Sequence, residues 1–200
     1  SPTISNRWIN ALQKKSRLPL LAGMDAEWGA SMRYDSIKKF PWNMTLGAIQ
    51  DDELIEEIGY KIGTQLKSLG ININFSPVVD INTNPLNPII GNRSFGEDKF
   101  NVLQKSLKMM KGMHRAGILT CAKHFPGHGE TIKDSHYDLP LVNFDKNRID
   151  SVELYPYKKL IPQGISSIMV GHLNYPALDD GIPSSLSKKI VDGLLIKELD

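Results

Sequence analysis

Short apolar runs alternate along this chain with segments in which apolar residues recur every three or four positions. The apolar runs predict strands at residues 18–24, 71–80, 117–122 and 165–171. The amphipathic segments predict helices at residues 5–15, 51–69, 98–116, 151–162 and 187–200. Strands that lack polar alternation and are separated by helices are typical of a parallel sheet covered by helices, so we expect an α/β fold.

Polar residues stand at the end of each predicted strand. Asp25 follows the first strand, Asp80 ends the second, Lys123 and His124 follow the third, and His172 follows the fourth. An open doubly wound sheet concentrates such residues at one switch point, whereas a (β/α)8 barrel gathers them from many strand ends. The pattern therefore favours a partial (β/α)8 TIM-type barrel with parallel strands and covering helices. It is expected to be partial because four strands cannot close a barrel, which normally takes about 250 residues.

The composition is that of an ordinary globular chain, with 40% apolar residues, 23% charged residues and a net charge of +2. The sequence has no long basic run, and no apolar run approaches the ~20 residues that span a bilayer. We therefore expect no nucleic-acid partner and no membrane-spanning segment. The single cysteine, Cys121, lies in a predicted strand and is expected to be a small buried hydrophobic residue.

Titratable side chains are concentrated at residues 123–136, KHFPGHGETIKDSH, which hold three of the five histidines. Imidazole is the side chain whose unperturbed pKa lies closest to neutral pH, so such a cluster suggests a functional site. Three interpretations are open. The loop can be a metal site built from His124, His128, His136 and Asp134, a structural loop held by its own hydrogen bonds, or the carrier of an acid–base pair.

The third interpretation is favoured by the local sequence. A metal site that used the HxxxH spacing would need a helix, which Pro126, Gly127 and Gly129 oppose. Asp134 and His136 are two positions apart, so the carboxylate can hold one ring nitrogen and direct the other toward a substrate. We therefore expect acid–base catalysis by this pair.

The stretch KHFPGHGETIKDSHYDLP resembles the signature of glycoside hydrolase family 3, in particular its β-N-acetylglucosaminidase branch. Other segments agree with the family in the same order, namely LAGMDAEWG, SPVVDINTNP, GNRSFGED and MVGHLNYPALD. Several separated motifs in order are stronger than any one of them. The resemblance covers nearly the whole chain. It implies a retaining, exo-acting enzyme that removes terminal β-linked N-acetylglucosamine (GlcNAc) from peptidoglycan-derived fragments.

The resemblance also implies roles for single residues. His136 would be the general acid/base, with Asp134 as its partner in a dyad. The sugar hydroxyls would be bound by the charged side chains of Asp25, Arg93, Lys123 and His124. Asp80 is expected to orient Arg93 or Lys123, or to touch the sugar itself. His172 is expected either to line the site or to be a buried structural histidine.

The sequence departs from the family pattern in two respects. Most bacterial members read Asp-x-Glu-Gly-Gly-Arg after the second strand, whereas Trp28 and Ala30 stand here in place of a glycine and the arginine. Arg33, three residues further on, is not assumed to replace that arginine. The family nucleophile is an aspartate on a later strand, which we expect beyond Asp200. Residues 1–200 would then be a single barrel fragment that lacks the first strand and the C-terminal strands, and that is inactive alone.

The family mechanism requires no metal and no organic cofactor. The expected partner is a small carbohydrate, and the full-length protein has room for a further C-terminal domain. Localisation stays open between the cytoplasm and the periplasm. The alternatives are a β-glycoside phosphorylase, since a histidine tolerates an incoming phosphate that a carboxylate would repel, a β-glucosidase or xylosidase, a non-catalytic sugar-binding fragment, and a metallohydrolase.

Overall fold

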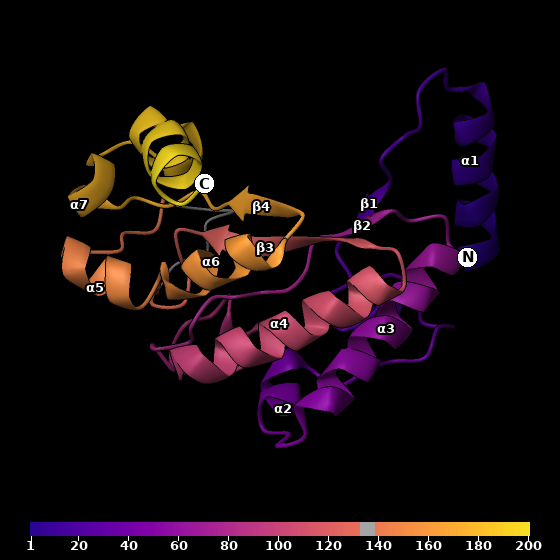
Figure 1. The fold of residues 1–200 in the computed structure, drawn as a ribbon, viewed down its shortest axis with the longest axis horizontal. Coiled ribbons are helices and arrows are strands. Elements are labelled where there is room, and N and C mark those ends of the chain that lie inside the picture. The colour runs from indigo at the N-terminus through magenta and orange to yellow at the C-terminus, as the bar shows by residue number, and fades with distance from the viewer. Residues whose placement is uncertain (133–138) are drawn as a thin grey trace.

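The computed structural model describes residues 1–132 and 139–200 (Figure 1). Within these residues the strands form parallel pairs in the order β1-β2-β3-β4. They are β1 (Gly23–Met24), β2 (Ile73–Asn74), β3 (Leu119–Phe125) and β4 (Ser167–Val170). Each strand pairs with the next one along the chain, without the reversal of order that marks a doubly wound sheet. The predicted α/β fold with parallel strands is confirmed, and its strand order is that of a barrel wall.

The first strand is much shorter than the predicted run at residues 18–24. The beginning of that run is tied to α1 (Pro2–Lys15) and not to the sheet. The side-chain amide of Gln13 donates a hydrogen bond to the Leu20 carbonyl (2.7 Å), and the Leu20 N–H donates to Gln13 Oε1 (2.9 Å). These two bonds occupy the backbone groups that a strand would use for its ladder.

The second strand is also shorter than the predicted run at residues 71–80. Pro77 has no N–H to donate to a ladder, so regular pairing stops before it. The chain rejoins β3 through a bridge between Val78 and Lys123. The segment therefore still runs beside β3 and brings Asp80 to the carboxyl end of the sheet.

The third strand begins at Leu119, two residues after the predicted start, and continues through Lys123 and His124 to Phe125. Its register against β4 shifts between Lys123 and Phe125, and the peptide bond between Lys123 and His124 is cis. Cys121 is buried in this strand as expected, and burial raises the pKa of its thiol.

Two long helices, α3 (Asp52–Ser68) and α4 (Lys99–Arg115), confirm the two central helix predictions. Each begins after an aspartate, Asp51 or Asp98, whose side chain accepts a backbone hydrogen bond from the first turn. Among the described residues, none of the helices is both long enough and apolar enough to cross a bilayer.

The helices around β4 differ from the prediction. The single helix expected at residues 151–162 is divided into α5 (Lys146–Ser151) and α6 (Tyr155–Leu160). Pro156 lies in the first turn of α6, because a residue without an N–H fits there and not in a helix interior. The last predicted helix is a π-helix at Lys189–Glu198. Two short helices were not predicted, α2 (Asn43–Gly47) and α7 (Pro176–Asp179).

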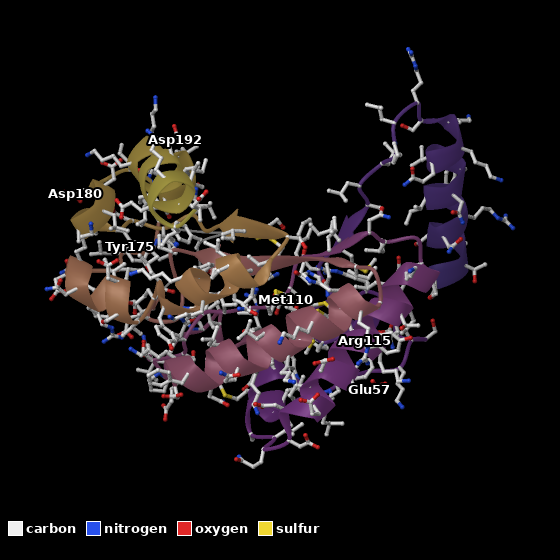
Figure 2. All side chains as sticks on the ribbon, viewed as in Figure 1. Glu57, Met110, Arg115, Tyr175, Asp180 and Asp192 are labelled. Atoms are coloured by element: carbon white, nitrogen blue, oxygen red, sulfur yellow. The ribbon has the colours of Figure 1, made fainter. Side chains whose placement is uncertain are left out.

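α3 and α4 lie side by side along one face of the sheet (Figure 1). Met110 of α4 is buried in the core under β3, whereas Glu57 and Arg115 pair on the outer surface (Figure 2). The helix backbones approach closely at Gly112, where an added Cβ would lie 2.0 Å from the backbone oxygen of Glu56. This contact fixes the distance between the two helices.

We expect Gly112→Ala to lower the free energy of unfolding by about 1–3 kcal/mol, since the two helices must move apart to admit a methyl group. Urea titration of the purified chain measures the change. Gly193→Ala is the matched control, because among the described residues no atom outside its chain neighbours and its own helix backbone lies within 4 Å of the added Cβ. That substitution should be neutral or stabilise the helix by up to about 1 kcal/mol. Equal destabilisation by both substitutions would contradict the close helix contact.

Candidate functional site

A pocket of about 390 Å³ opens at the carboxyl ends of the strands. Small-molecule sites typically measure roughly 300–1,000 Å³. The pocket wall includes every residue that the sequence assigned to binding within the described part of the chain, namely Asp25, Arg93, Lys123 and His124. These side chains are up to 99 positions apart in the sequence. The parallel sheet brings them together because its carboxyl ends meet at one edge.

Lys123 is the buried centre of the pocket. Its side chain is 2% exposed, and its Nζ lies 2.9 Å from Asp25 Oδ1 and 2.8 Å from Glu27 Oε1. Partial burial acts to raise the pKa of Asp25, but the hydrogen bond and charge of Lys123, together with the charges of Arg33 and Arg93, lower it. Asp25 is therefore held as a carboxylate.

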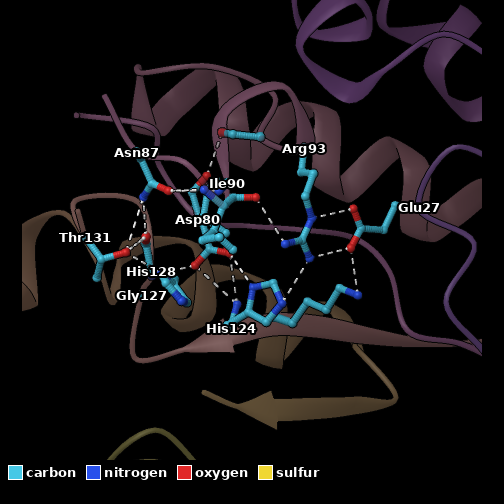
Figure 3. Close-up of polar contacts among 12 residues, drawn as sticks. Glu27, Asp80, Asn87, Ile90, Arg93, His124, Gly127, His128 and Thr131 are labelled. Atoms are coloured by element: carbon cyan, nitrogen blue, oxygen red, sulfur yellow. Dashed lines mark hydrogen bonds and ion pairs between the residues drawn. The ribbon is translucent and has the colours of Figure 1, made fainter. Parts of the chain in front are cut away.

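Glu27 is a site residue that the sequence analysis missed. It is 2% exposed and forms a two-pronged ion pair with Arg93, with Nε 3.0 Å from Oε2 and Nη2 2.7 Å from Oε1 (Figure 3). Burial acts to raise the pKa of Glu27, and the bonds and charges of Arg93 and Lys123 together lower it. The available signal was its place in the DAEWGA segment, two residues after Asp25.

The hydrogen bonds of Asp80 do not go to the partners expected for it. The hydrogen bonds of its carboxylate go to His124 and to the backbone of His128, and not to Arg93 or Lys123 (Figure 3). Arg93 is instead oriented by Glu27 and lies 3.2 Å from His124, between Nη2 and Nε2. Asp80 thus holds His124 from behind the pocket.

The departures from the family pattern have simple structural outcomes. Trp28 packs against Trp42 with 4.0 Å between the ring centroids, and Ala30 is fully buried. Arg33 lines the pocket, and its Nη2 lies 3.3 Å from Asp25 Oδ2. A second arginine therefore supplies positive charge beside Asp25. Sequence reasoning left Arg33 unassigned because the path of the loop before it was unknown.

The remaining histidines differ in exposure. His172 is exposed and lines the pocket, with its Nδ1 2.6 Å from Ser185 Oγ, so it is not a buried structural residue. His128 is 2% exposed, and burial lowers its pKa. Its Nδ1 lies 2.6 Å from Thr131 Oγ1, and its carbonyl accepts a hydrogen bond from Asn87 Nδ2 (2.7 Å). These contacts hold the beginning of the histidine loop.

Asp134 and His136, the predicted acid–base pair, lie at residues 133–138, outside the residues that the structure describes. Elsewhere in the chain, no group of three or more His, Cys, Asp or Glu side chains is arranged to hold a metal ion. In the described pocket, the carboxylates of Asp25 and Glu27 are engaged by cations. The arrangement presents charged hydrogen-bond donors and acceptors side by side, which suits a polyhydroxylated ligand.

A parallel sheet in barrel order, with a polar pocket at the carboxyl ends of its strands, is the arrangement of part of an α/β barrel with a small-molecule site. The chain belongs to the glycosyl hydrolase family 3 N terminal domain, whose family model matches residues 4–200.

Relatives of known name agree with this family. Beta-hexosaminidase A of Pseudoalteromonas piscicida is 40% identical over 94% of this chain and 34% of its own length. The structure of a glycoside hydrolase family 3 beta-N-acetylglucosaminidase from Paenibacillus sp. str. FPU-7 has a TM-score of 0.92 and 38% identity, over 99% of this chain and 38% of that one. Beta-glucoside phosphorylase BglX bound to 2FGlc has a TM-score of 0.95 and 27% identity, over 100% of this chain and 38% of that one. The chain thus spans between 34% and 38% of the length of these relatives.

Glu27→Gln should destabilise the fold, because it leaves Arg93 and Lys123 without their shared carboxylate. Removing one partner of a buried ion pair typically costs about 3–5 kcal/mol. Urea titration measures the loss. Glu57→Gln, in an exposed pair with Arg115, is the control and should leave the unfolding midpoint almost unchanged. A wild-type midpoint for Glu27→Gln would count against the buried network.

The same substitution should alter the dependence of stability on pH. The folded-state pKa of Glu27 lies below its ordinary value of 4.5. The stability that its ionised form supplies is therefore complete above the unfolded-state pKa and is lost as pH falls through the folded-state pKa. Glu27→Gln should give a flatter curve of unfolding free energy below about pH 4.5. Curves of equal slope would argue that Glu27 does not titrate in this way.

Proposed function

We propose that the full-length protein is a retaining, exo-acting β-N-acetylglucosaminidase and that this chain supplies its sugar-binding pocket. The observation that carries the proposal is the set of charged side chains gathered around Lys123, in a domain of glycosyl hydrolase family 3. The name of the Paenibacillus relative supports the choice of GlcNAc, and the name of the Pseudoalteromonas relative supports a hexosaminidase. The proposed substrates are peptidoglycan-derived fragments with a terminal β-linked GlcNAc.

The proposed sugar contacts are made by Asp25, Arg93, Lys123 and His124. A hydroxyl group both donates and accepts, so neighbouring hydroxyls can bridge an ammonium and a carboxylate such as Lys123 and Asp25. Bonds to charged partners are about twice as strong as neutral ones. Because Glu27 and Asp80 already hold the cations and the imidazole, binding requires little rearrangement of the pocket.

The proposed chemistry is a double displacement. His136, paired with Asp134, protonates the leaving oxygen while a carboxylate attacks the anomeric carbon and forms a glycosyl-enzyme. The unprotonated imidazole then takes a proton from water, which displaces the sugar and restores both groups. We propose that the attacking aspartate comes from a part of the longer polypeptide outside this chain, together with the strands that complete the barrel and any further C-terminal domain.

The role of His136 can be tested by leaving-group dependence. In the full-length protein, His136→Ala should reduce kcat/KM for GlcNAc disaccharides by roughly 10²–10⁴-fold, because their leaving oxygen needs protonation. The loss should be much smaller with 4-nitrophenyl GlcNAc, whose leaving group departs without an acid. His114→Ala, at the opposite end of the sheet from the pocket, is the matched control. Equal losses on both substrates would show that His136 is not the acid.

The second candidate, a β-glycoside phosphorylase, is favoured by one observation, the likeness to the solved phosphorylase structure at a TM-score of 0.95. The two activities differ only in whether water or phosphate attacks the glycosyl-enzyme. We expect the full-length protein to release free GlcNAc in phosphate buffer, which chromatography of the products would detect. Accumulation of GlcNAc 1-phosphate would replace the hydrolase proposal by the phosphorylase one.

A further inference from the structure

Asp80 is a buried carboxylate between the pocket and the loop that begins at Pro126. Its side chain is completely shielded from solvent and is not part of the pocket wall. In Figure 3 it lies between His124 and Arg93 on one side and His128 on the other. It therefore cannot reach a ligand and can act only through the groups that it holds.

The carboxylate of Asp80 accepts bonds from two neighbouring residues of β3 and the loop. One oxygen accepts from the His124 ring Nδ1 (2.7 Å), and the other accepts from the His128 backbone N–H (2.7 Å). The His124 backbone N–H lies 3.2 Å from both oxygens. Burial acts to raise the pKa of Asp80, but its interactions with His124 and His128 lower it. All these partners are donors, so the site is built for an ionised acceptor.

The hydrogen bonds also define where the ring proton of His124 lies. Nε2 of His124 is 3.2 Å from Nη2 of Arg93, and a guanidinium can only donate. Nε2 must therefore accept in this contact, and the proton is on Nδ1, from which it is donated to Asp80. The opposite tautomer would bring two donors together at Arg93.

We propose that Asp80 is a positioning residue that couples the two functional parts of the site. It places the ring proton of His124 on Nδ1, which leaves Nε2 to accept from Nη2 of Arg93 and so orients both side chains at the pocket. Through the His128 N–H it also fixes the origin of the loop that leads to His136. The proposal rests on the proposed function, in which His124 binds the sugar and the loop carries the acid/base.

Asp80→Asn is the direct test, because the amide has the shape of the carboxylate but turns one acceptor into a donor. The amide can satisfy either the His124 ring or the His128 N–H, and a donor then faces a donor at the other. In the full-length protein we expect the Kd for GlcNAc to rise roughly 10- to 100-fold, the range found when the carboxylate behind a metal-binding histidine is removed. An unchanged Kd would overturn the proposal.

A double-mutant cycle separates positioning from general damage. If Asp80 acts on sugar binding through His124, then Asp80→Asn should have almost no further effect on the GlcNAc Kd in a His124→Ala background. Additive losses would show that Asp80 contributes independently of His124 and would contradict the proposal.

Asn87→Ala provides a matched control for the loop. Asn87 bonds the carbonyl of His128 and makes no hydrogen bond to His124. Its removal should lower kcat for disaccharides without the rise in the GlcNAc Kd that Asp80→Asn produces. Equal increases in Kd for both variants would mean that the loop, and not the His124 ring, determines binding.

The position of the proton can be measured without a substrate. ¹⁵N NMR of the full-length protein labelled at histidine should show His124 protonated on Nδ1, with its signals assigned by their loss in His124→Ala. Asp80→Asn should lower the fraction of His124 that carries its proton on Nδ1. If the His124 ring of the wild-type protein carries its proton on Nε2, the proposal is wrong, whether or not Asp80→Asn folds. Failure of the wild-type protein to bind GlcNAc would instead refute the proposed function.

Discussion

Burying the ammonium group of Lys123 is the constraint on which this site depends. An unpaired charge in a protein interior is too costly to persist, so carboxylates must meet it there. Asp25 and Glu27 do so from the end of β1, at 2.9 Å and 2.8 Å. Glu27 uses its remaining acceptor capacity to hold Arg93, which follows β2 in the chain. One buried cation thus ties β3 to the segment after β1 and, through Glu27, to the short 3-10 helix that ends at Arg93.

This network explains a site that is strongly charged and yet rigid. Buried ion pairs add little net stability compared with apolar packing, but each has a fixed geometry once its partners are buried. Behind His124, the buried carboxylate of Asp80 holds the imidazole ring by a hydrogen bond, as Glu27 and Asp25 hold the ammonium group of Lys123. The groups that would face a ligand are therefore oriented before it arrives, so binding requires little reorganisation.

The sequence was sufficient to predict the alternating strands and helices of the fold. Apolar strands alternating with capped helices predicted a parallel sheet, and a parallel sheet brings Asp25, Lys123 and His124 to one edge. The sequence was not sufficient to predict the paths of the loops. Glu27 and Arg33 reach the pocket because of a turn at Gly29, with φ of 97°, and a short 3-10 helix after it. The spacing of apolar and polar residues does not predict the path of such a loop. The hydrogen-bond partners of Asp80 depend on the path of residues 76–80 beside β3. That path could not be predicted from the sequence, because Pro77 interrupts the regular strand.

The same loop explains why the chain can depart from the family pattern without losing the charges of the pocket. Ala30 is fully buried in the core, so this position contributes no charge to the pocket wall. Trp28 packs on Trp42 and is likewise absent from that wall. The carboxylates on either side of Lys123 keep their places, and Arg33 pairs with Asp25 from the end of the loop. What the site requires is a carboxylate at each side of the buried lysine and a cation at the mouth, and that requirement leaves the residues between them free to vary.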